Sequence, residues 1–212
     1  MLNSFQTFLV LAPHTDDAEL GAGATIAKLR REGKTVIVAS FSDVIDSVPK
    51  NLPKDTLRIE FMNSMEFLLG STETAHCFSF PVRNFTENRQ SILDKMLKLK
   101  AQYKPEVVFL PSLNDDHQDH QVIAHEALRG FKNSVLLSYE LQWNMRRAEI
   151  NLFSHVTSTD CQKKLTALNE YKSQCFREYF SEEYIKSLLR TRGIQAGCQF
   201  AEGFEFVKGR FI

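Results

Sequence analysis

Apolar residues along the chain fall into short runs that alternate with longer amphipathic stretches. The short runs are rich in β-branched and aromatic residues, which is typical of buried strands. They lie at Phe8–Ala12, Thr35–Phe41, Cys77–Phe80, Val107–Leu110 and Val135–Tyr139. The longer stretches between them have helical patterning. They cover Glu19–Arg31, Lys54–Leu69, Glu87–Gln102 and His120–Phe131.

Strands that alternate with helices of this length predict an α/β fold. Such connections are right-handed crossovers, so the sheet should be mostly parallel and covered by helices on both faces. We therefore expect a Rossmann-like three-layer sandwich. Three of the helices also have a glycine near their expected end, where a residue with positive φ is often required. These glycines are Gly33, Gly70 and Gly130.

The last third of the chain is less regular. It contains a predicted strand near Leu152–Val156, predicted helices at about Asp160–Lys172 and Ser181–Arg190, and the aromatic-rich stretch Phe200–Phe211. No internal repeat and no linker rich in Pro, Gly or Ser separates this part from the rest. We therefore expect one domain over residues 1–212, in which the part from about residue 150 forms a cap and edge strands.

Charge and cysteine content narrow the classes of partner. Lys plus Arg and Asp plus Glu both total 26, which argues against a nucleic acid or an anionic membrane surface. No apolar run approaches the roughly 20 residues that cross a bilayer, and Met1–Thr7 does not resemble a signal peptide. The four cysteines form no CxxC pair. We expect a cytoplasmic protein with a small-molecule substrate, and a homo-oligomer is compatible with these data.

The first concentration of reactive side chains directly follows the first predicted strand. His14, Asp16 and Asp17 lie there, and ligands of open α/β sheets bind at the carboxyl ends of strands. One imidazole and two carboxylates can supply a nitrogen ligand, an oxygen ligand and a spare base to a metal such as Zn²⁺. By itself, however, the segment also fits a helix cap with solvated carboxylates.

The second concentration, Asn114 to His120, follows the fourth predicted strand. Two histidines three residues apart, His117 and His120, make a simple turn a poor explanation. Three protein ligands with one open position are typical of catalytic zinc. Water in that position has a pKa near 7, and a carboxylate that is not a ligand can accept its proton. The spacing predicts a site with His14, one aspartate of the doublet and His120, and does not decide which aspartate binds the metal.

The remaining polar residues of these two loops have predicted supporting roles. A donating imidazole near the metal can stabilise the negative oxygen of a tetrahedral intermediate, and His117 is the candidate. A carboxylate can fix the orientation of a ligand histidine through the other ring nitrogen. Asp119 and Asp115 are the candidates for that role.

Two of these segments resemble known signatures. Pro13-His14-Thr15-Asp16-Asp17, followed by Gly21–Thr25, resembles the first signature of PIG-L/LmbE-type N-deacetylases, and His117-Gln118-Asp119-His120 resembles the second, H-x-D-H. The resemblance continues through Lys164–Gln174 and Arg192–Phe204. Thr15 stands where the family has proline, and Ala24 where it has glycine. These two departures affect the geometry of the loop and remove none of the residues that carry the signature's chemistry.

The resemblance assigns a role to each residue of the two signatures. It implies that His14, Asp17 and His120 bind the metal, that Asp16 is the general base and that His117 assists the oxyanion. It also implies Zn²⁺ as the cofactor, although Fe²⁺, Co²⁺ or Mn²⁺ suits the same ligands.

The resemblance further implies a hydrolase that removes the acetyl group from an N-acetylglucosamine-type conjugate. The loop around Arg83 is similar to that of members associated with nucleotide sugars or surface-polysaccharide precursors. Arg83 is the candidate contact for a negatively charged aglycone or phosphate. Trp143 is a second candidate contact, which stacks on a sugar ring or packs within the protein.

Three alternatives remain open at the level of sequence. The first is a metal-dependent amidohydrolase with a non-sugar acyl substrate. The second is a non-catalytic sugar-binding module, against which the spare carboxylate of Asp16 argues. The third is a nucleotide-binding domain, which is disfavoured because the first strand leads to His and Asp rather than to glycines.

Overall fold

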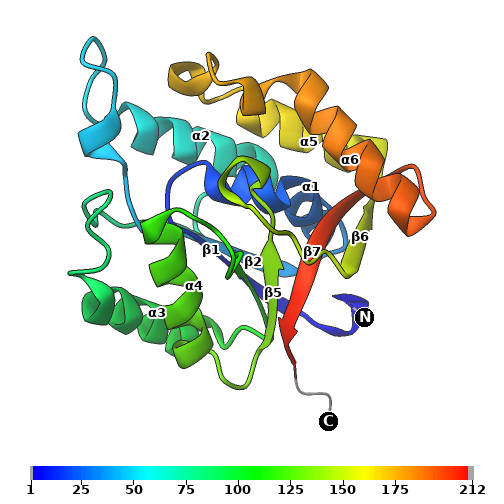
Figure 1. The fold of residues 1–212 in the computed structure, drawn as a ribbon, viewed down its shortest axis with the longest axis horizontal. Helices are drawn as coiled ribbons and strands as arrows, with labels where there is room; N and C mark the ends of the chain where they lie inside the picture. The colour runs from blue at the N-terminus through cyan, green and yellow to red at the C-terminus, as the bar shows by residue number, and fades with distance from the viewer. Residues whose placement is uncertain (1, 210–212) are drawn as a thin grey trace.

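A seven-stranded sheet lies at the centre of the computed structural model, which describes residues 2–209 (Figure 1). The strand order is β3-β2-β1-β4-β5-β7-β6. The first five of these strands are mutually parallel, and β7 runs antiparallel to both of its neighbours. The strands are β1 (Thr7–Ala12), β2 (Thr35–Ser40), β3 (Ala75–Cys77), β4 (Val107–Pro111), β5 (Val135–Tyr139), β6 (Leu152–Val156) and β7 (Phe200–Lys208).

Helices cover both faces of this sheet (Figure 1). One layer contains α1 (Asp17–Arg31), α2 (Thr56–Leu69), α5 (Ser158–Leu168) and α6 (Glu182–Ala196). The other layer contains α3 (Arg89–Tyr103) and α4 (Gln118–Gly130). Short 3-10 turns lie at Leu2–Ser4, Ile45–Ser47, Gln142–Asn144, Lys172–Gln174 and Glu178–Phe180. The predicted α/β fold with a mostly parallel sheet is confirmed.

The strands β1, β2, β4 and β5 are mostly apolar because both of their faces are buried. In β1, Phe8 and Val10 pack against the layer that contains α1, whereas Leu9 and Leu11 pack against α3 and α4. All four side chains are fully buried. Each contributes about 1.5–3 kcal/mol of burial free energy relative to an exposed position. This two-sided burial explains why the sequence shows continuous apolar runs rather than alternation.

Two of the predicted details differ from the structure. The third strand begins two residues earlier than expected and ends at Cys77, although the Phe78 N–H still bonds to the Ser40 carbonyl at 2.8 Å. Gly33 and Gly70 have positive φ, as predicted. The same expectation for Gly130 is wrong, because Gly130 is the last residue of α4 and has no positive φ.

The last third of the chain is part of the sandwich rather than a separate cap. β6 lies at the sheet edge as expected, but β7 lies inside the sheet between β5 and β6. α5 packs against α1 and α2 and so completes their layer. The end of the predicted segment Phe200–Phe211 lies outside the described residues. The assignment of residues 1–212 to one domain stays a prediction.

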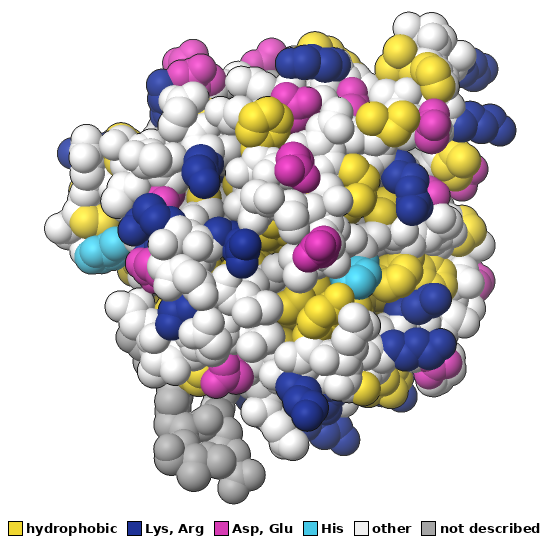
Figure 2. Space-filling model, turned by 180° about the vertical axis from the view of Figure 1, so that it is seen from behind, with side chains coloured by type: hydrophobic (Ala, Val, Ile, Leu, Met, Phe, Trp, Pro, Cys, Tyr) yellow, Lys and Arg dark blue, Asp and Glu magenta, His cyan; other side chains and the backbone are white. Residues whose placement is uncertain are grey.

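The surface and helix lengths add two observations. Among the described residues, none of the helices combines the length and the apolar character that a membrane span requires. On the face seen in Figure 2, basic and acidic side chains are interspersed rather than gathered into one large area of a single sign.

The strand order brings two loops together. β1 pairs with both β2 and β4, so the direction in which strands are added reverses between β1 and β4. At such a switch point the loops after the two strands diverge and leave a crevice at their carboxyl ends. The loop after β1 contains His14 to Asp16, and the loop after β4 leads to His117. Both concentrations of reactive side chains therefore border the same crevice.

Close packing of α1 on the sheet depends on a glycine. A Cβ atom on Gly21 would lie 2.3 Å from Cδ2 of Tyr139, a buried side chain whose hydroxyl donates to the Leu11 carbonyl at 3.0 Å. We predict that Gly21→Ala destabilises the protein by roughly 1–3 kcal/mol through overpacking. An ordinary helix interior would instead gain about 0.5–1 kcal/mol from this change.

Urea denaturation followed by circular dichroism measures this difference. Gly130→Ala is the matched control, because a Cβ there would make only an ordinary contact with Leu93 at 3.4 Å. Equal unfolding free energies for the two variants would contradict the proposed role of Gly21.

Candidate active site

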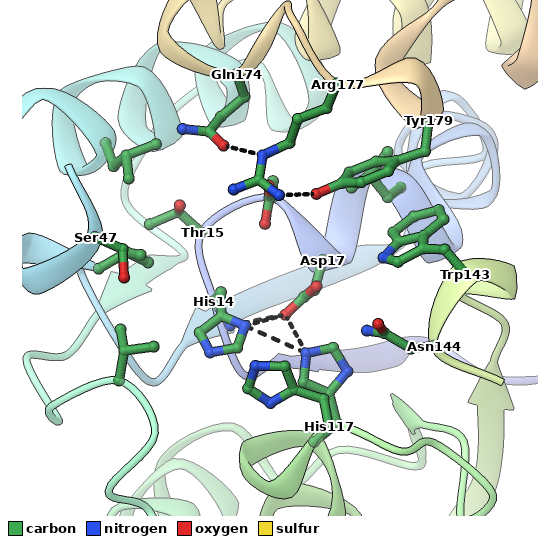
Figure 3. Close-up of a pocket in the computed structure, with 16 residues that line it drawn as sticks. His14, Thr15, Asp17, Ser47, His117, Trp143, Asn144, Gln174, Arg177 and Tyr179 are labelled. Carbon is green, nitrogen blue, oxygen red and sulfur yellow. Dashed lines mark hydrogen bonds and ion pairs between the residues drawn. The ribbon is translucent and has the colours of Figure 1, made fainter. Parts of the chain in front are cut away.

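Three side-chain atoms from the two loops meet at the switch point. His14 Nδ1 lies 3.3 Å from Asp17 Oδ2 and 3.2 Å from His120 Nε2, and His120 Nε2 lies 3.4 Å from Asp17 Oδ2. Figure 3 shows His14 and Asp17 directed toward each other at the floor of a cavity. The side chains of Asp17 and His120 are almost completely buried. The three atoms form a nearly equilateral triangle.

The triangle fits a small divalent ion. Ligand atoms about 2.0–2.1 Å from a tetrahedral zinc lie about 3.3–3.4 Å from one another. His14 Nε2 faces Asp119 and His120 Nδ1 faces Asp115, so the lone pairs of the remaining ring nitrogens face the triangle when the rings are neutral. Two imidazoles and one carboxylate are ligands that zinc accepts.

The electrostatics of the triangle favour positive charge. Burial by itself lowers the pKa of His14, but hydrogen bonds to Asp119 and Asp17 outweigh it and raise the pKa to about 10. Burial by itself raises the pKa of the Asp17 carboxyl, but the charge of His120 and the hydrogen bond with His14 lower it to about 2. A cation bound here would replace the proton that these shifts describe.

Two buried carboxylates fix the orientation of His14 and His120. His14 Nε2 donates to Asp119 Oδ2 at 3.1 Å, and His120 Nδ1 donates to Asp115 Oδ2 at 2.8 Å. Asp119 also accepts from the backbone N–H of Arg83 at 2.6 Å, which holds this carboxylate in place. The structure thus brings both predicted supporting aspartates to ring nitrogens on the far side of the triangle.

His117 lies beside the triangle as a neutral hydrogen-bond donor. It is the N-cap residue of α4, and its Nδ1 accepts from the Asp119 N–H at 3.2 Å, so the ring proton must lie on Nε2. Burial and the charge of His14 lower its pKa to about 4. Ring nitrogens of His14, His117 and His120 all lie within 4.8 Å of one another, so this cluster can hold a metal ion.

The two neighbouring aspartates of the first loop have different surroundings. Asp17 accepts from the His14 backbone N–H at 2.8 Å and belongs to the triangle. Asp16 occupies the N-cap position of α1, but its side chain makes no capping hydrogen bond. Burial and the charge of Asp17 raise the pKa of Asp16 to about 6. The Asp16 carboxylate lines the cavity, where it can accept a proton.

The cavity above the triangle has a volume of about 250 Å³. Trp143 lines it, and its ring stacks on Tyr179 with 4.0 Å between ring centroids. The side chain of Arg83 is exposed and does not line the cavity. The backbone N–H of this residue donates to Asp119. Arg83 has a φ of 65°, a conformation that few non-glycine residues adopt.

Several cavity residues carry no motif and were not predicted. They come from the irregular segments after β2, β5 and α5, and they are Val44, Ser47, Asn144, Gln174, Arg177 and Tyr179. Gln174 ends the stretch Lys164–Gln174 that resembles the family, but the resemblance gave this residue no role. Arg177 and Tyr179 lie in the aromatic-rich segment Phe176–Phe180, which on its own is equally typical of a core.

Fold and site together define a Rossmann-like α/β protein with a histidine and aspartate centre suited to a metal ion. The family model of PIG-L, described as GlcNAc-PI de-N-acetylase, matches residues 9–130, more than half of the chain. The protein therefore belongs to the PIG-L family and is a deacetylase, as predicted. Both loops of the site lie within the matched residues.

Several known proteins are similar to this chain in sequence or in fold. Diacetylchitobiose deacetylase of Thermococcus kodakarensis is 23% identical over 233 aligned positions, which cover 99% of this chain and 86% of that protein. The crystal structure of the conserved protein TT1542 from Thermus thermophilus superposes with a TM-score of 0.80 at 23% identity, covering 98% and 97% of the two chains. GalB, a 4-carboxy-2-hydroxymuconate hydratase from Pseudomonas putida, superposes with a TM-score of 0.79 at 21% identity, covering 98% of both. These two superpositions show a shared fold.

The hydrogen bond from His120 to Asp115 predicts an effect on metal affinity. Asp115→Asn keeps the shape but removes the carboxylate that fixes His120 Nδ1. We expect zinc to bind about 10- to 100-fold more weakly. Calorimetric titration of the metal-free protein measures this.

Asp116→Asn is the control for this experiment. Asp116 is the next residue, but its carboxylate is exposed and pairs with Arg146 rather than with His14 or His120. Unchanged zinc affinity in Asp115→Asn would contradict the orienting role.

Proposed function

We propose that the protein is a metal-dependent N-deacetylase that releases acetate from an N-acetylglucosamine-type amino sugar. In this proposal His14, Asp17 and His120 bind the metal, with zinc as the expected ion. Asp16 is the general base, and His117 donates to the oxyanion. The observation that carries the proposal is the triangle of ligand atoms with the uncapped carboxylate of Asp16 beside it.

A divalent ion at the triangle would supply Lewis-acid activation of water and of the acetyl carbonyl. The protein supplies the remaining requirements through its own side chains. Asp119 and Asp115 hold the ligand rings, so little reorganisation is needed when the ion binds. Burial of the triangle strengthens every electrostatic interaction within it.

The reaction itself needs a base, an oxyanion donor and a proton for the leaving group. Water adds to the acetyl carbon and gives its proton to Asp16. The carbonyl oxygen becomes negative and accepts a hydrogen bond from His117 Nε2–H. When the C–N bond breaks, the amine nitrogen takes the proton from Asp16, and the amine and acetic acid are formed. The acid then gives its proton to the amine, so acetate and the protonated amino sugar leave. Atoms and charge balance with one water consumed.

The sugar substrate is supported by the relatives and by the cavity wall. The Thermococcus kodakarensis relative is named for the deacetylation of diacetylchitobiose, an N-acetylated sugar. In this chain Trp143 and Tyr179 present a stacked aromatic pair to the cavity, and aromatic rings suit the apolar face of a pyranose. A cytoplasmic location, a homo-oligomer and the absence of nucleic-acid partners stay predictions.

An acyl substrate without a sugar is the rival within this class. Acetate release from N-acetyllysine as fast as from N-acetylglucosamine conjugates would favour it.

Substitution of the base separates metal binding from turnover. We predict that Asp16→Asn retains the bound metal but lowers kcat by about 10²- to 10⁴-fold, because the amide cannot accept the water proton. Metal content by atomic emission and acetate release from N-acetylglucosamine conjugates, including a nucleotide sugar, measure the two properties.

His14→Ala serves as the comparison and should lose both the metal and the activity. Near-normal turnover by Asp16→Asn would refute the assignment of the base. Loss of the metal from that variant would instead place Asp16 among the ligands.

A further inference from the structure

One arginine faces the catalytic groups across the cavity. Arg177 lies between the 3-10 turns Lys172–Gln174 and Glu178–Phe180 and lines the same cavity as His14 and Asp16. Figure 3 shows its guanidinium reaching toward the cavity from the wall opposite His14 and His117. Among the described residues, Arg177 is the only Lys or Arg in the cavity lining.

The guanidinium is held in place by its neighbours. Nε donates to Gln174 Oε1 at 2.7 Å, and Nη1 donates to the Tyr179 hydroxyl at 2.6 Å. The charge also lies over the rings of Phe176 and Tyr179, at 5.4 and 5.6 Å from their centroids. Such contacts reduce the entropy that the long side chain would lose when it binds a ligand.

The partner Gln174 is itself anchored in the protein interior. It is buried, and its amide nitrogen donates to Ser173 Oγ at 3.1 Å. Ser173 in turn donates to both carboxylate oxygens of Glu60 on α2, at 2.8 Å from its backbone N–H and 2.6 Å from its hydroxyl. A chain of hydrogen bonds thus links the position of Arg177 to the helical layer.

The charge of Arg177 is not neutralised by an ion pair. Within the described residues, none of the carboxylates lies within 4.0 Å of its guanidinium, and Nη2 makes no hydrogen bond to another described residue. Six other arginines do pair with carboxylates, namely Arg31, Arg89, Arg129, Arg146, Arg147 and Arg192. Among the described residues, the acidic side chains that line the cavity are Asp16 and Asp17, and neither forms an ion pair with Arg177. The side chains that contact its guanidinium are uncharged.

We propose that Arg177 binds an anionic group of the substrate, a phosphate or a carboxylate attached to the amino sugar. The proposal rests on the proposed deacetylase function, which places the acetamido group at the triangle below. A planar guanidinium with a free edge matches the two oxygens of either anion. The proposal assigns the contact with a charged aglycone to Arg177 rather than to Arg83, whose side chain lies outside the cavity.

Matched substrates test this specificity. The neutral probe is the methyl glycoside of N-acetylglucosamine, and the anionic probes are its 1-phosphate, its 6-phosphate and its carboxymethyl glycoside. We expect zinc-loaded wild-type protein to have a kcat/KM at least tenfold higher for one anionic probe than for the neutral one. Which probe is preferred reports whether a phosphate or a carboxylate is recognised.

Arg177→Gln should lower kcat/KM for the preferred anionic probe roughly 10- to 100-fold more than for the methyl glycoside, mainly through KM. Arg147→Gln is the matched control, because this arginine is exposed, pairs with Glu149 and lies outside the cavity lining. It should leave the preference of the wild type unchanged.

Two kinetic outcomes would overturn the proposal. One is a wild type that does not prefer any anionic probe. The other is an equal loss of kcat for charged and neutral probes in Arg177→Gln, which would place Arg177 in the reaction itself.

Calorimetric binding of the same probes separates this proposal from the deacetylase function. If no probe is turned over, the deacetylase function fails, and tighter binding of an anionic probe that Arg177→Gln abolishes would still support the anion site. Equal binding of charged and neutral probes would overturn it.

Discussion

The pairing of β1 with β4 is the constraint on which the site depends. His14 and His120 are more than one hundred residues apart, yet their ring nitrogens lie 3.2 Å from each other because the loops after two neighbouring parallel strands share one crevice. Polar groups buried this deeply are costly unless they have partners. Asp119 and Asp115 satisfy the outer ring nitrogens, so the inner ones can be held toward Asp17.

The position of α1 is the second requirement, because this helix begins with Asp17. Gly21 allows the helix to approach Tyr139, and a buried ion pair holds its middle. Lys164 donates to the Leu20 carbonyl at 2.7 Å and to Glu202 at 2.8 Å, and Glu202 accepts from the backbone N–H groups of Ala24 and Thr25. Lys164 of α5 and Glu202 of β7 lie in the two later stretches that resemble the family. Both residues are far from the site in sequence, and both hold α1 in its place on the sheet.

The cavity combines two kinds of structure. Its floor consists of His14 in the loop after β1 and of side chains from the first turns of α1 and α4, and hydrogen bonds hold these side chains in place. Its walls come from the irregular segments around Ser47, Asn144 and Arg177. Irregular segments of this kind vary without disturbing the sheet, so they are where a common hydrolytic centre can acquire a particular substrate.

The sequence by itself determined the alternating elements, the two loops and the family, since apolar periodicity and short motifs are local properties. The spacing of the two adjacent aspartates did not decide which of them joins the triangle, and only the family resemblance implied Asp17. The tertiary structure shows that Asp17 joins the triangle and that Asp16 faces the cavity, because the backbone directs the two side chains differently. It also placed β7 inside the sheet and put Arg177, rather than Arg83, in the cavity. These outcomes depend on which segments become neighbours and on the direction of the backbone at each residue, and neither is visible in a local pattern.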